Sequence, residues 1–252
     1  EGQKSAAIYT ENSTPVNKGT INVEGEESAG IFAKNTDNKD YTIENTGTIN
    51  LKGTATPPGT QSAGIYAELG SGAGKTTVYN KNDIVVGQES SVGIYVKNNT
   101  GDRNKGKAIN TGKIDLDVDS TVGIFVDKAI GENEGVINVK KKNSAGMYAS
   151  DSNATNTATG TITLTGSTGA NSGSAGMYGK LTSAATTADY TILNQGQIQL
   201  TSVTKNVGIY GTTGASVTKK LTLQNEKEIN IANGSEQSVG IFAKNDDSNN
   251  KD

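Results

Sequence analysis

The chain contains no cysteine, no histidine and no tryptophan, and Arg103 is its only arginine. Without cysteine and histidine it cannot form disulfides, Ser-His-Asp or Cys-His catalytic groups, or zinc sites built from those residues. Its net charge is −3, and lysines are interspersed with acidic residues, so a basic nucleic-acid-binding face is not expected. No apolar stretch approaches the ~18 residues of a membrane-spanning helix.

Hydrophobic residues are scarce, at 32% of the chain, while glycine alone contributes 32 residues. Ordinary globular domains contain ~45–50% apolar residues when glycine is included. This composition would fit a disordered chain. However, the isoleucines and aromatic residues recur at regular positions, which favours a thin periodic core under a polar surface.

One motif reads Ser-small-Gly-Ile-aromatic-small. It occurs at residues 28–33, 62–67 and 91–96. The eight full copies centre on Gly30, Gly64, Gly93, Gly123, Gly146, Gly176, Gly208 and Gly240, and a degenerate copy lies at residues 5–10. Such internal repetition is typical of solenoid proteins.

A second motif, Asn-x-Gly-x-Ile-x-aliphatic, alternates with the first, and a short β-prone stretch such as residues 41–43 precedes it. Its isoleucines are Ile21, Ile49, Ile84, Ile114, Ile137, Ile162, Ile198 and Ile229. Asn82 and Lys227 replace the glycine in two copies, and Ala158 replaces the asparagine in another. Because lysine disfavours a left-handed backbone, we do not expect this position to require positive φ.

The alternation within both motifs has period two, which indicates β-strands. It places Ile21 and Val23 on one face, and it predicts that Ala29, Ile31 and Ala33 share a face. Such short strands must pair with the equivalent strand one repeat further on. The sequence therefore predicts an all-β fold, a right-handed parallel β-helix (β-solenoid) of about 8–9 coils. We expect residues 1–252 to form a single segment of a longer repeat array.

The asparagines of the second motif are predicted to stack at a corner of the solenoid, where their amides would hydrogen-bond from coil to coil. The predicted ladder comprises Asn17, Asn45, Asn80, Asn110, Asn133, Asn194 and Asn225. Loops of varying length, notably residues 52–61 with Pro57 and Pro58 and residues 165–173, are expected between coils.

Nine of the twelve aromatic residues occupy one repeat position, next to the inward isoleucine, so they are expected on an outer face. They are Tyr9, Phe32, Tyr66, Tyr95, Phe125, Tyr148, Tyr178, Tyr210 and Phe242. A row of rings could stack on the sugars of a glycan. The candidate ligand-facing residues are Tyr66, Tyr95, Tyr148, Tyr178 and Tyr210. The alternative is a structural ladder packed under loops.

Other polar clusters have both a functional and a structural interpretation. Asp115, Asp117 and Asp119 project from one face and could attract Ca²⁺ or act as the acid and base of a glycosidase, or form a solvated acidic strand.

The glycine-rich runs 70–74 and 166–176 lack the helix that a phosphate-binding loop needs, so we interpret them as loops. Residues 140–142, three lysines, are interpreted as a solvated turn. We assign no catalytic residue, no cofactor-binding residue and no metal ligand.

The paired motifs, Ser-Ala-Gly-Ile-Tyr-Ala with Asn-x-Gly-x-Ile-x-Val, resemble the passenger domains of bacterial type V autotransporters. They are most similar to the very large fusobacterial outer-membrane autotransporter adhesins, the group that includes RadD. The resemblance covers essentially the whole chain. It implies a cell-surface passenger displayed by a longer protein that carries a secretion signal and a C-terminal membrane β-barrel, neither of which this sequence contains. It also implies adhesion to partner bacteria or to host cell-surface proteins or glycans, with roles in biofilm formation and virulence.

The leading hypothesis is a non-enzymatic adhesin segment that is monomeric and needs no cofactor. Alternatively, the segment is a spacer and the adhesin binds its receptor elsewhere. A β-helix enzyme acting on polysaccharides is a further alternative, which the single aspartate cluster and single arginine disfavour. An ice-binding rod would need a regular threonine array, but the outer positions vary among Thr, Lys, Asp, Asn and Gln.

Overall fold

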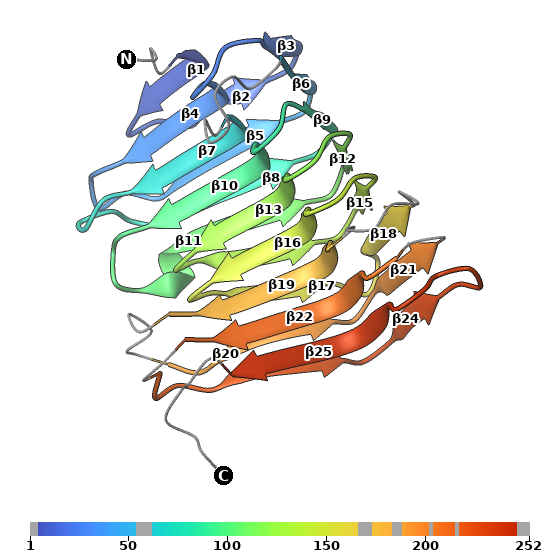
Figure 1. The fold of residues 1–252 in the computed structure, drawn as a ribbon. Helices are drawn as coiled ribbons and strands as arrows, with labels where there is room; N and C mark the ends of the chain where they lie inside the picture. Colours follow the sequence, from blue (N-terminus) through green and yellow to red (C-terminus); the bar gives the residue numbers. More distant parts are fainter. Residues whose placement is uncertain are drawn as a thin grey trace.

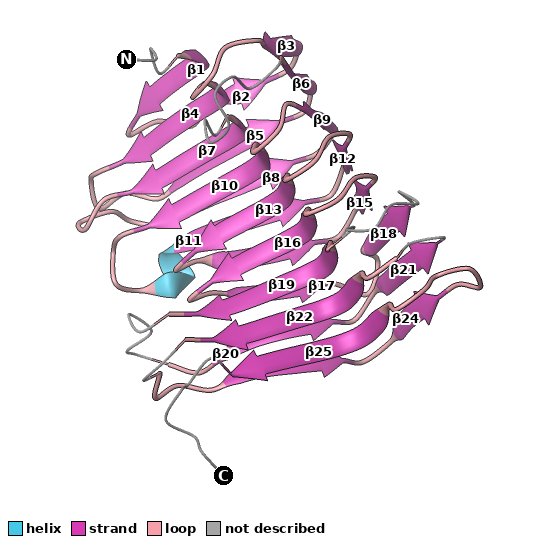
Figure 2. Ribbon diagram, viewed as in Figure 1, coloured by secondary structure: helices cyan, strands magenta, loops and turns pink. Residues whose placement is uncertain are grey.

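The computed structural model describes residues 5–53, 62–165, 173–182, 188–201, 204–214 and 217–245. The chain winds into a right-handed parallel β-helix with three strands per coil (Figure 1). Strands and the turns between them make up the described residues apart from one 3₁₀ helix, η1 (Arg103–Lys105) (Figure 2). The predicted loops at 52–61 and 165–173 fall largely outside the described residues.

Each coil contributes one strand to each of three sheets. The first sheet contains β1 (Ala6–Glu11), β4 (Ala29–Asn35), β7 (Ala63–Leu69), β10 (Val92–Asn98), β13 (Val122–Asp127), β16 (Ala145–Ser150), β19 (Ala175–Leu181), β22 (Val207–Thr213) and β25 (Val239–Asn245). The second contains β2 (Val16–Asn17), β5 (Tyr41–Asn45), β8 (Thr76–Asn80), β11 (Gly106–Asn110), β14 (Ile130–Asn133), β17 (Asn153–Asn156), β20 (Tyr190–Asn194) and β23 (Leu221–Asn225). The third contains β3 (Thr20–Val23), β6 (Thr48–Lys52), β9 (Asp83–Gly87), β12 (Lys113–Leu116), β15 (Val136–Val139), β18 (Thr161–Thr165), β21 (Gln197–Thr201) and β24 (Glu228–Ile231). The described strands therefore form eight coils and begin a ninth, which confirms the predicted fold.

The strands pair in parallel, and the register places like residues on like. Ile21 pairs with Ile49, and Ile49 pairs with Ile84. Ile31 pairs with Ile65 in the first sheet in the same way. Because each short strand has both neighbours in adjacent coils, every coil depends on the next one for its backbone hydrogen bonds.

The core is the column of aliphatic side chains between the three sheets. Ile31, Ile65, Ile49 and Ile84 are fully buried there. Burying one isoleucine stabilises the fold by roughly 1.5–3 kcal/mol, so a single coil cannot offset its own ordering entropy. In the last described coil, which has a neighbour on one side only, Ile229 is partly buried and Ile241 is exposed.

The glycine of the first motif breaks the predicted alternation. A Cβ on Gly30 would lie 2.9 Å from Cγ2 of Ile49 and 2.7 Å from the carbonyl oxygen of Gly64, so both Gly30 and Ile31 face the interior. Ala33 joins the core cluster, whereas Ala29, although buried, lies outside that cluster and lines the groove beside Phe32. The prediction that Ala29 shares a face with Ile31 was therefore wrong. Gly30 and Ile31 both face inward, which interrupts the alternation and places Ala29 on the opposite side from Ile31.

Close packing also requires the glycine of the second motif in some coils, although Asn82 and Lys227 occupy the position in two others and nothing lies within 4 Å of a Cβ on Gly19. A Cβ on Gly47 would collide with the carbonyl oxygen of Gly19 in the preceding coil. The described glycines with positive φ are Gly53, Gly101, Gly173 and Gly234, none of which belongs to this motif. The expectation that the position needs no positive φ is confirmed.

The predicted asparagine ladder is present, and it is buried except at Asn225, which is exposed. Each amide nitrogen donates to the side-chain oxygen of the next asparagine along the solenoid, at 2.7–2.9 Å. The structure adds one member, Asn156, which bridges Asn133 and Asn194. The motif missed Asn156 because two extra residues separate it from Gly160. The Asn156 amide donates to the Gly160 carbonyl four residues on, whereas the Asn194 amide donates to the Gly196 carbonyl two residues on.

The serine of the first motif forms a second ladder that the sequence did not predict. The backbone N–H of Ser28 donates to Oγ of Ser62, and that of Ser62 donates to Oγ of Ser91. Thr121 and Ser144 continue the pattern. These hydroxyls satisfy buried backbone groups at the corner where each coil enters the first sheet.

We expect Gly93→Ala to destabilise the fold by about 1–3 kcal/mol, because the new methyl would lie 2.7 Å from the Gly123 carbonyl oxygen and 3.0 Å from Cγ2 of Ile114. Gly19→Ala is the control, since nothing lies within 4 Å of a Cβ built there. Thermal unfolding followed by circular dichroism measures both variants. Equal melting temperatures would contradict the packing role.

Asn110→Ala should lower the free energy of unfolding by about 2 kcal/mol, because it removes one hydrogen bond from the buried Asn80 amide, which still donates to the Asn82 carbonyl, and the bond that the buried Asn133 side-chain oxygen accepts. Asn22→Ala removes a comparable but exposed interaction, the bond from Asn50 at 3.0 Å, and should change stability little. Urea titration compares the two. A similar loss in both would show that burial of the ladder is unimportant.

Candidate functional site: the aromatic face

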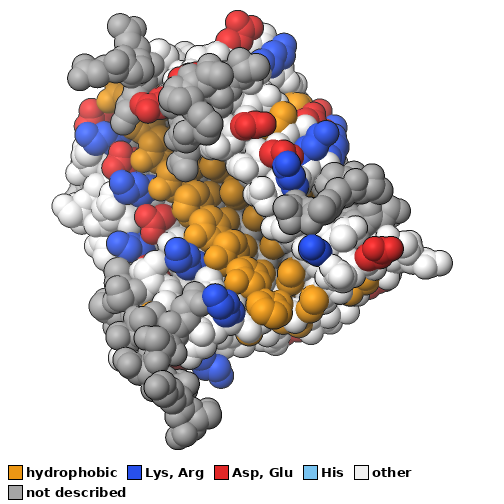
Figure 3. All heavy atoms as spheres, in the orientation of Figure 1, with side chains coloured by type: hydrophobic (Ala, Val, Ile, Leu, Met, Phe, Trp, Pro, Cys, Tyr) orange, Lys and Arg blue, Asp and Glu red, His pale blue; other side chains and the backbone are white. Residues whose placement is uncertain are grey.

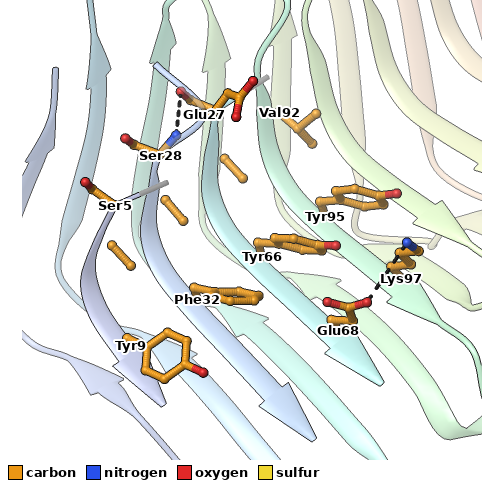
Figure 4. Close-up of a pocket in the computed structure, with 14 residues that line it drawn as sticks. Ser5, Tyr9, Glu27, Ser28, Phe32, Tyr66, Glu68, Val92, Tyr95 and Lys97 are labelled. Carbon is orange, nitrogen blue, oxygen red and sulfur yellow. Dashed lines mark hydrogen bonds and ion pairs between the residues drawn. The ribbon is translucent and has the colours of Figure 1, made fainter. Parts of the chain in front are cut away.

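The aromatic column lies on the outward surface of the first sheet, as predicted. In-register pairing places Phe32 beside Tyr66 and Tyr66 beside Tyr95. Figure 4 shows these rings projecting from neighbouring strands on the same side. The end rings are the open ones: Tyr9 is 59% exposed and Phe242 is 44% exposed. The rings between them are half-buried by their neighbours.

Ring geometry divides the column into two parts. From Phe32 to Phe125 the rings stack nearly parallel, with centroids 4.7–5.1 Å apart and interplanar angles of 24°, 8° and 4°. From Phe125 to Tyr210 the centroids are 4.7–4.8 Å apart, but the angles are 30°, 34° and 57°. Each stacked pair stabilises the fold by about 0.5–1.5 kcal/mol beyond burial.

Stacking restricts how the candidate residues can meet a ligand. Tyr66 and Tyr95 cover each other's faces and are covered by Phe32 and Phe125, so they present edges and hydroxyls outward. A sugar ring cannot lie flat on them. Tyr148 and Tyr178 are tilted against each other by 34°, whereas Tyr210 is tilted against Tyr178 by 57° and stacks on Phe242 at 10°. Ligand binding by all five tyrosines remains a prediction.

A shallow groove runs beside the rings along the solenoid axis. Ala29, Ala63 and Val92 line its first part together with the rings of the first four coils, with a volume of about 770 Å³ (Figure 4). A second part of about 440 Å³ is lined by Val122, Ala145, Ala175 and Val207 beside Tyr148, Tyr178 and Tyr210. Figure 3 shows this surface as a continuous band of hydrophobic side chains. We call the aromatic column and the adjoining alanines and valines the aromatic face.

One margin of the aromatic face carries charges of alternating sign, two residues beyond each ring. In coil order these are Glu11, Lys34, Glu68, Lys97 and Asp127, followed by Ser150 and Lys180. Figure 3 shows acidic and basic side chains alternating beside the hydrophobic band. Lys34–Glu11 and Lys97–Glu68 are each 4.0 Å apart and partly exposed, so each ion pair is weak.

The phenols at this margin are held in their protonated form. Burial, with the nearby Asp127 and Glu68 carboxylates, raises the pKa of Tyr95 to about 12. Burial and the Glu68 charge raise the pKa of Tyr66 further, and burial raises the pKa of Tyr148. Burial also raises the pKa of Asp127, although the Lys128 and Lys97 charges oppose this. The hydroxyls of these three tyrosines therefore stay protonated, and can donate hydrogen bonds, to higher pH than an ordinary phenol.

The aspartate cluster is an ion-pair network on the third sheet and its following turn. Lys140 Nζ lies 2.8 Å from Asp117 and 3.3 Å from Asp115, and Lys113 lies 3.1 Å from Asp115. Burial alone would raise the pKa of Asp115, but hydrogen bonds from Asn138 and Lys113 and the Lys140 charge outweigh it and lower the pKa. Within the described residues, no group of three acidic side chains is arranged to hold a metal ion.

The lysine turn is therefore not simply solvated. Lys140 neutralises two aspartates, and Lys142 lies 3.4 Å from Asp119. Lys141 between them is exposed. The sequence showed both clusters but not their pairing, because they are 23 residues apart and meet only when the coils stack. The glycine run 70–74 leads through a turn into β8, as expected of a loop.

Comparison with known families identifies the repeat. The family model of the BigA third pectate lyase-like domain matches residues 2–130 and 103–188. The chain belongs to this family. No curated protein and no solved structure matches the chain.

Membership in the BigA domain family agrees with the parallel β-helix and supports the expected assignment as a passenger-domain segment. Residues beyond 188 lie outside the matched ranges, but β20 to β25 continue the same three sheets. Among the described residues, no helix is both long and apolar enough to cross a membrane.

We expect Lys140→Ala to lower the free energy of unfolding at neutral pH by about 0.5–1 kcal/mol, because Asp115 and Asp117 lose a shared partner. Lys141→Ala, which removes an exposed neighbouring charge, is the control. The pKa of Asp115 is lowered in the folded state, so its stabilising effect is present above about pH 4 and disappears as the pH falls through the folded pKa.

The difference between the two variants should therefore shrink in acid. Urea denaturation of both, at neutral pH and at acidic pH, measures this. A difference that does not depend on pH would contradict the network.

Proposed function

We propose that this chain is a non-enzymatic segment of a bacterial cell-surface adhesin, part of a passenger domain displayed at the outer membrane. The observation that carries the proposal is the match of a continuous solenoid to the BigA domain family. The resemblance of both repeat motifs to fusobacterial autotransporter adhesins supports a protein of that kind. Its partners would be other bacteria, or proteins and glycans of host cells.

Within this proposal, the second half of the aromatic face is the best candidate for ligand contact. Tyr148, Tyr178 and Tyr210 combine tilted rings with an adjoining groove of about 440 Å³. Tyrosine is common at recognition surfaces, because its ring buries a large apolar area and its hydroxyl forms a directional hydrogen bond. Their hydroxyl groups and the adjoining apolar groove suit sugars or exposed peptide groups.

The spacer alternative is favoured by a specific feature, the self-covering stack from Phe32 to Phe125. Rings whose faces are covered by neighbouring rings stiffen the solenoid and need no ligand to bury them. A stiff rod built this way would carry a binding site located elsewhere in the adhesin.

Binding of the purified, fluorescently labelled chain to partner bacteria, host cells and a glycan array tests the proposal. We expect saturable binding that Tyr178→Ala weakens about tenfold, the range for truncating an aromatic contact residue. The control is Tyr79→Ala, which removes a half-buried ring from the outer surface of the second sheet. If Tyr178→Ala leaves binding unchanged, the ligand binds at a surface other than the aromatic face.

The alternatives give different results. If full-length adhesin binds the same cells while this chain does not, the segment is a spacer. If the chain cleaves glycans and Asp117→Asn abolishes the turnover, the non-enzymatic proposal is wrong.

A further inference from the structure

In the half of the aromatic face with nearly parallel rings, Phe32 to Phe125, the order of ring types is the same in both directions along the solenoid. Across β4, β7, β10 and β13 the rings read Phe, Tyr, Tyr, Phe, from Phe32, Tyr66, Tyr95 and Phe125. The charged margin of the same strands reads plus, minus, plus, minus, from Lys34, Glu68, Lys97 and Asp127. The ring order is thus unchanged on reversal, and the charge order changes sign at every position.

We propose that this face binds a second copy of the chain, with the two solenoids antiparallel and a two-fold axis between β7 and β10. A two-fold axis lying in the interface, perpendicular to the solenoid axis, places each margin over the same margin of the second copy in reverse order. Tyr66 then meets Tyr95 of the second copy, and Phe32 meets Phe125 of the second copy.

Charge complementarity selects this arrangement. Glu68 faces Lys97 of the second copy, and Lys34 faces Asp127 of the second copy, so symmetry generates four ion pairs. A parallel arrangement would instead place the charged margin over the serine side of the groove. The pair Lys97–Glu68 within one copy is 4.0 Å long, with side chains 37% and 29% exposed, so both groups can take a second partner.

The surface disfavours other occupants. A peptide cannot add as a strand here, because the interior strands of the first sheet are already paired on both sides. Sugars cannot lie flat on rings whose faces are covered. A polymer whose charges all have the same sign would be repelled by the margin residue of every second coil. A second copy offers ring edges, small apolar side chains and the opposite charge at each position.

The expected interface is small. Extended to β1 and β16, the paired region spans six strands, or about 24 Å at ~4.8 Å per strand, and ~20 Å along each strand. That gives on the order of 500 Å² per copy, below the ~800 Å² of a stable complex. The chain should be monomeric when dilute and pair weakly at high concentration, and many displayed copies would strengthen such a contact.

Pairing itself does not depend on the proposed function, although a role in joining cells that display the chain rests on it. Sedimentation equilibrium of the purified chain over a wide concentration range tests pairing alone. We expect weak dimerisation that high salt weakens. Lys97→Glu or Glu68→Lys should each weaken it about tenfold or more, because like charges then face each other.

One mixture and one double variant make the test specific. Equimolar Lys97→Glu and Glu68→Lys chains should associate with each other, since one copy then presents two acidic groups and the other two basic groups. The double variant Glu68→Lys with Lys97→Glu restores opposite charges and should dimerise alone. Glu44→Lys, on the second sheet, is the matched control, because Glu44 is 28% exposed and also paired to a lysine.

Circular dichroism must show that every variant remains folded. A chain that stays monomeric at all concentrations would overturn the proposal. So would dimerisation that persists in both single variants, which would indicate contact through the exposed last coil around Ile241 and Phe242. Failure of the mixed pair to associate would also overturn it. Cell or glycan binding can succeed or fail independently of these results.

Discussion

In-register pairing of each strand with its equivalent in the next coil is the constraint on which this structure depends. It satisfies the backbone of strands that are too short to be stable alone, and it forces every side chain to sit above its counterpart. Positions that repeat an apolar residue build the core. Positions that repeat a polar residue must find a partner in the adjacent coil or face water.

The three ladders are consequences of that stacking. Asparagine amides, serine hydroxyls and aromatic rings all suit a repeat of about 4.8 Å, because each offers complementary groups or surfaces on its two sides. The same stacking explains glycine at particular positions. Gly30 and Gly47 lie where the backbone of the neighbouring coil leaves no space for a Cβ. Close packing, rather than backbone conformation, selects glycine there.

The outer columns are less constrained, and the differences between coils are found there. The aromatic column keeps its residue type but changes ring tilt from one half to the other. The neighbouring margin alternates charge, and the third sheet pairs Asp115 and Asp117 with Lys140. A uniform interior thus supports an exterior that can specify contacts, which is the property an adhesive surface requires.

The sequence by itself determined the fold, the buried isoleucines, most of the asparagine ladder and the outward position of the rings, because all of these follow from periodicity. It could not determine that Ala29 turns outward, that Asn156 rather than Ala158 continues the ladder, or that Lys140 neutralises the aspartates. The sequence also did not predict that Glu27, Ser90 and Lys205 each have a positive φ. Each of these depends on where the neighbouring coil places its atoms, and only the tertiary structure fixes the distances that decide which side chains meet.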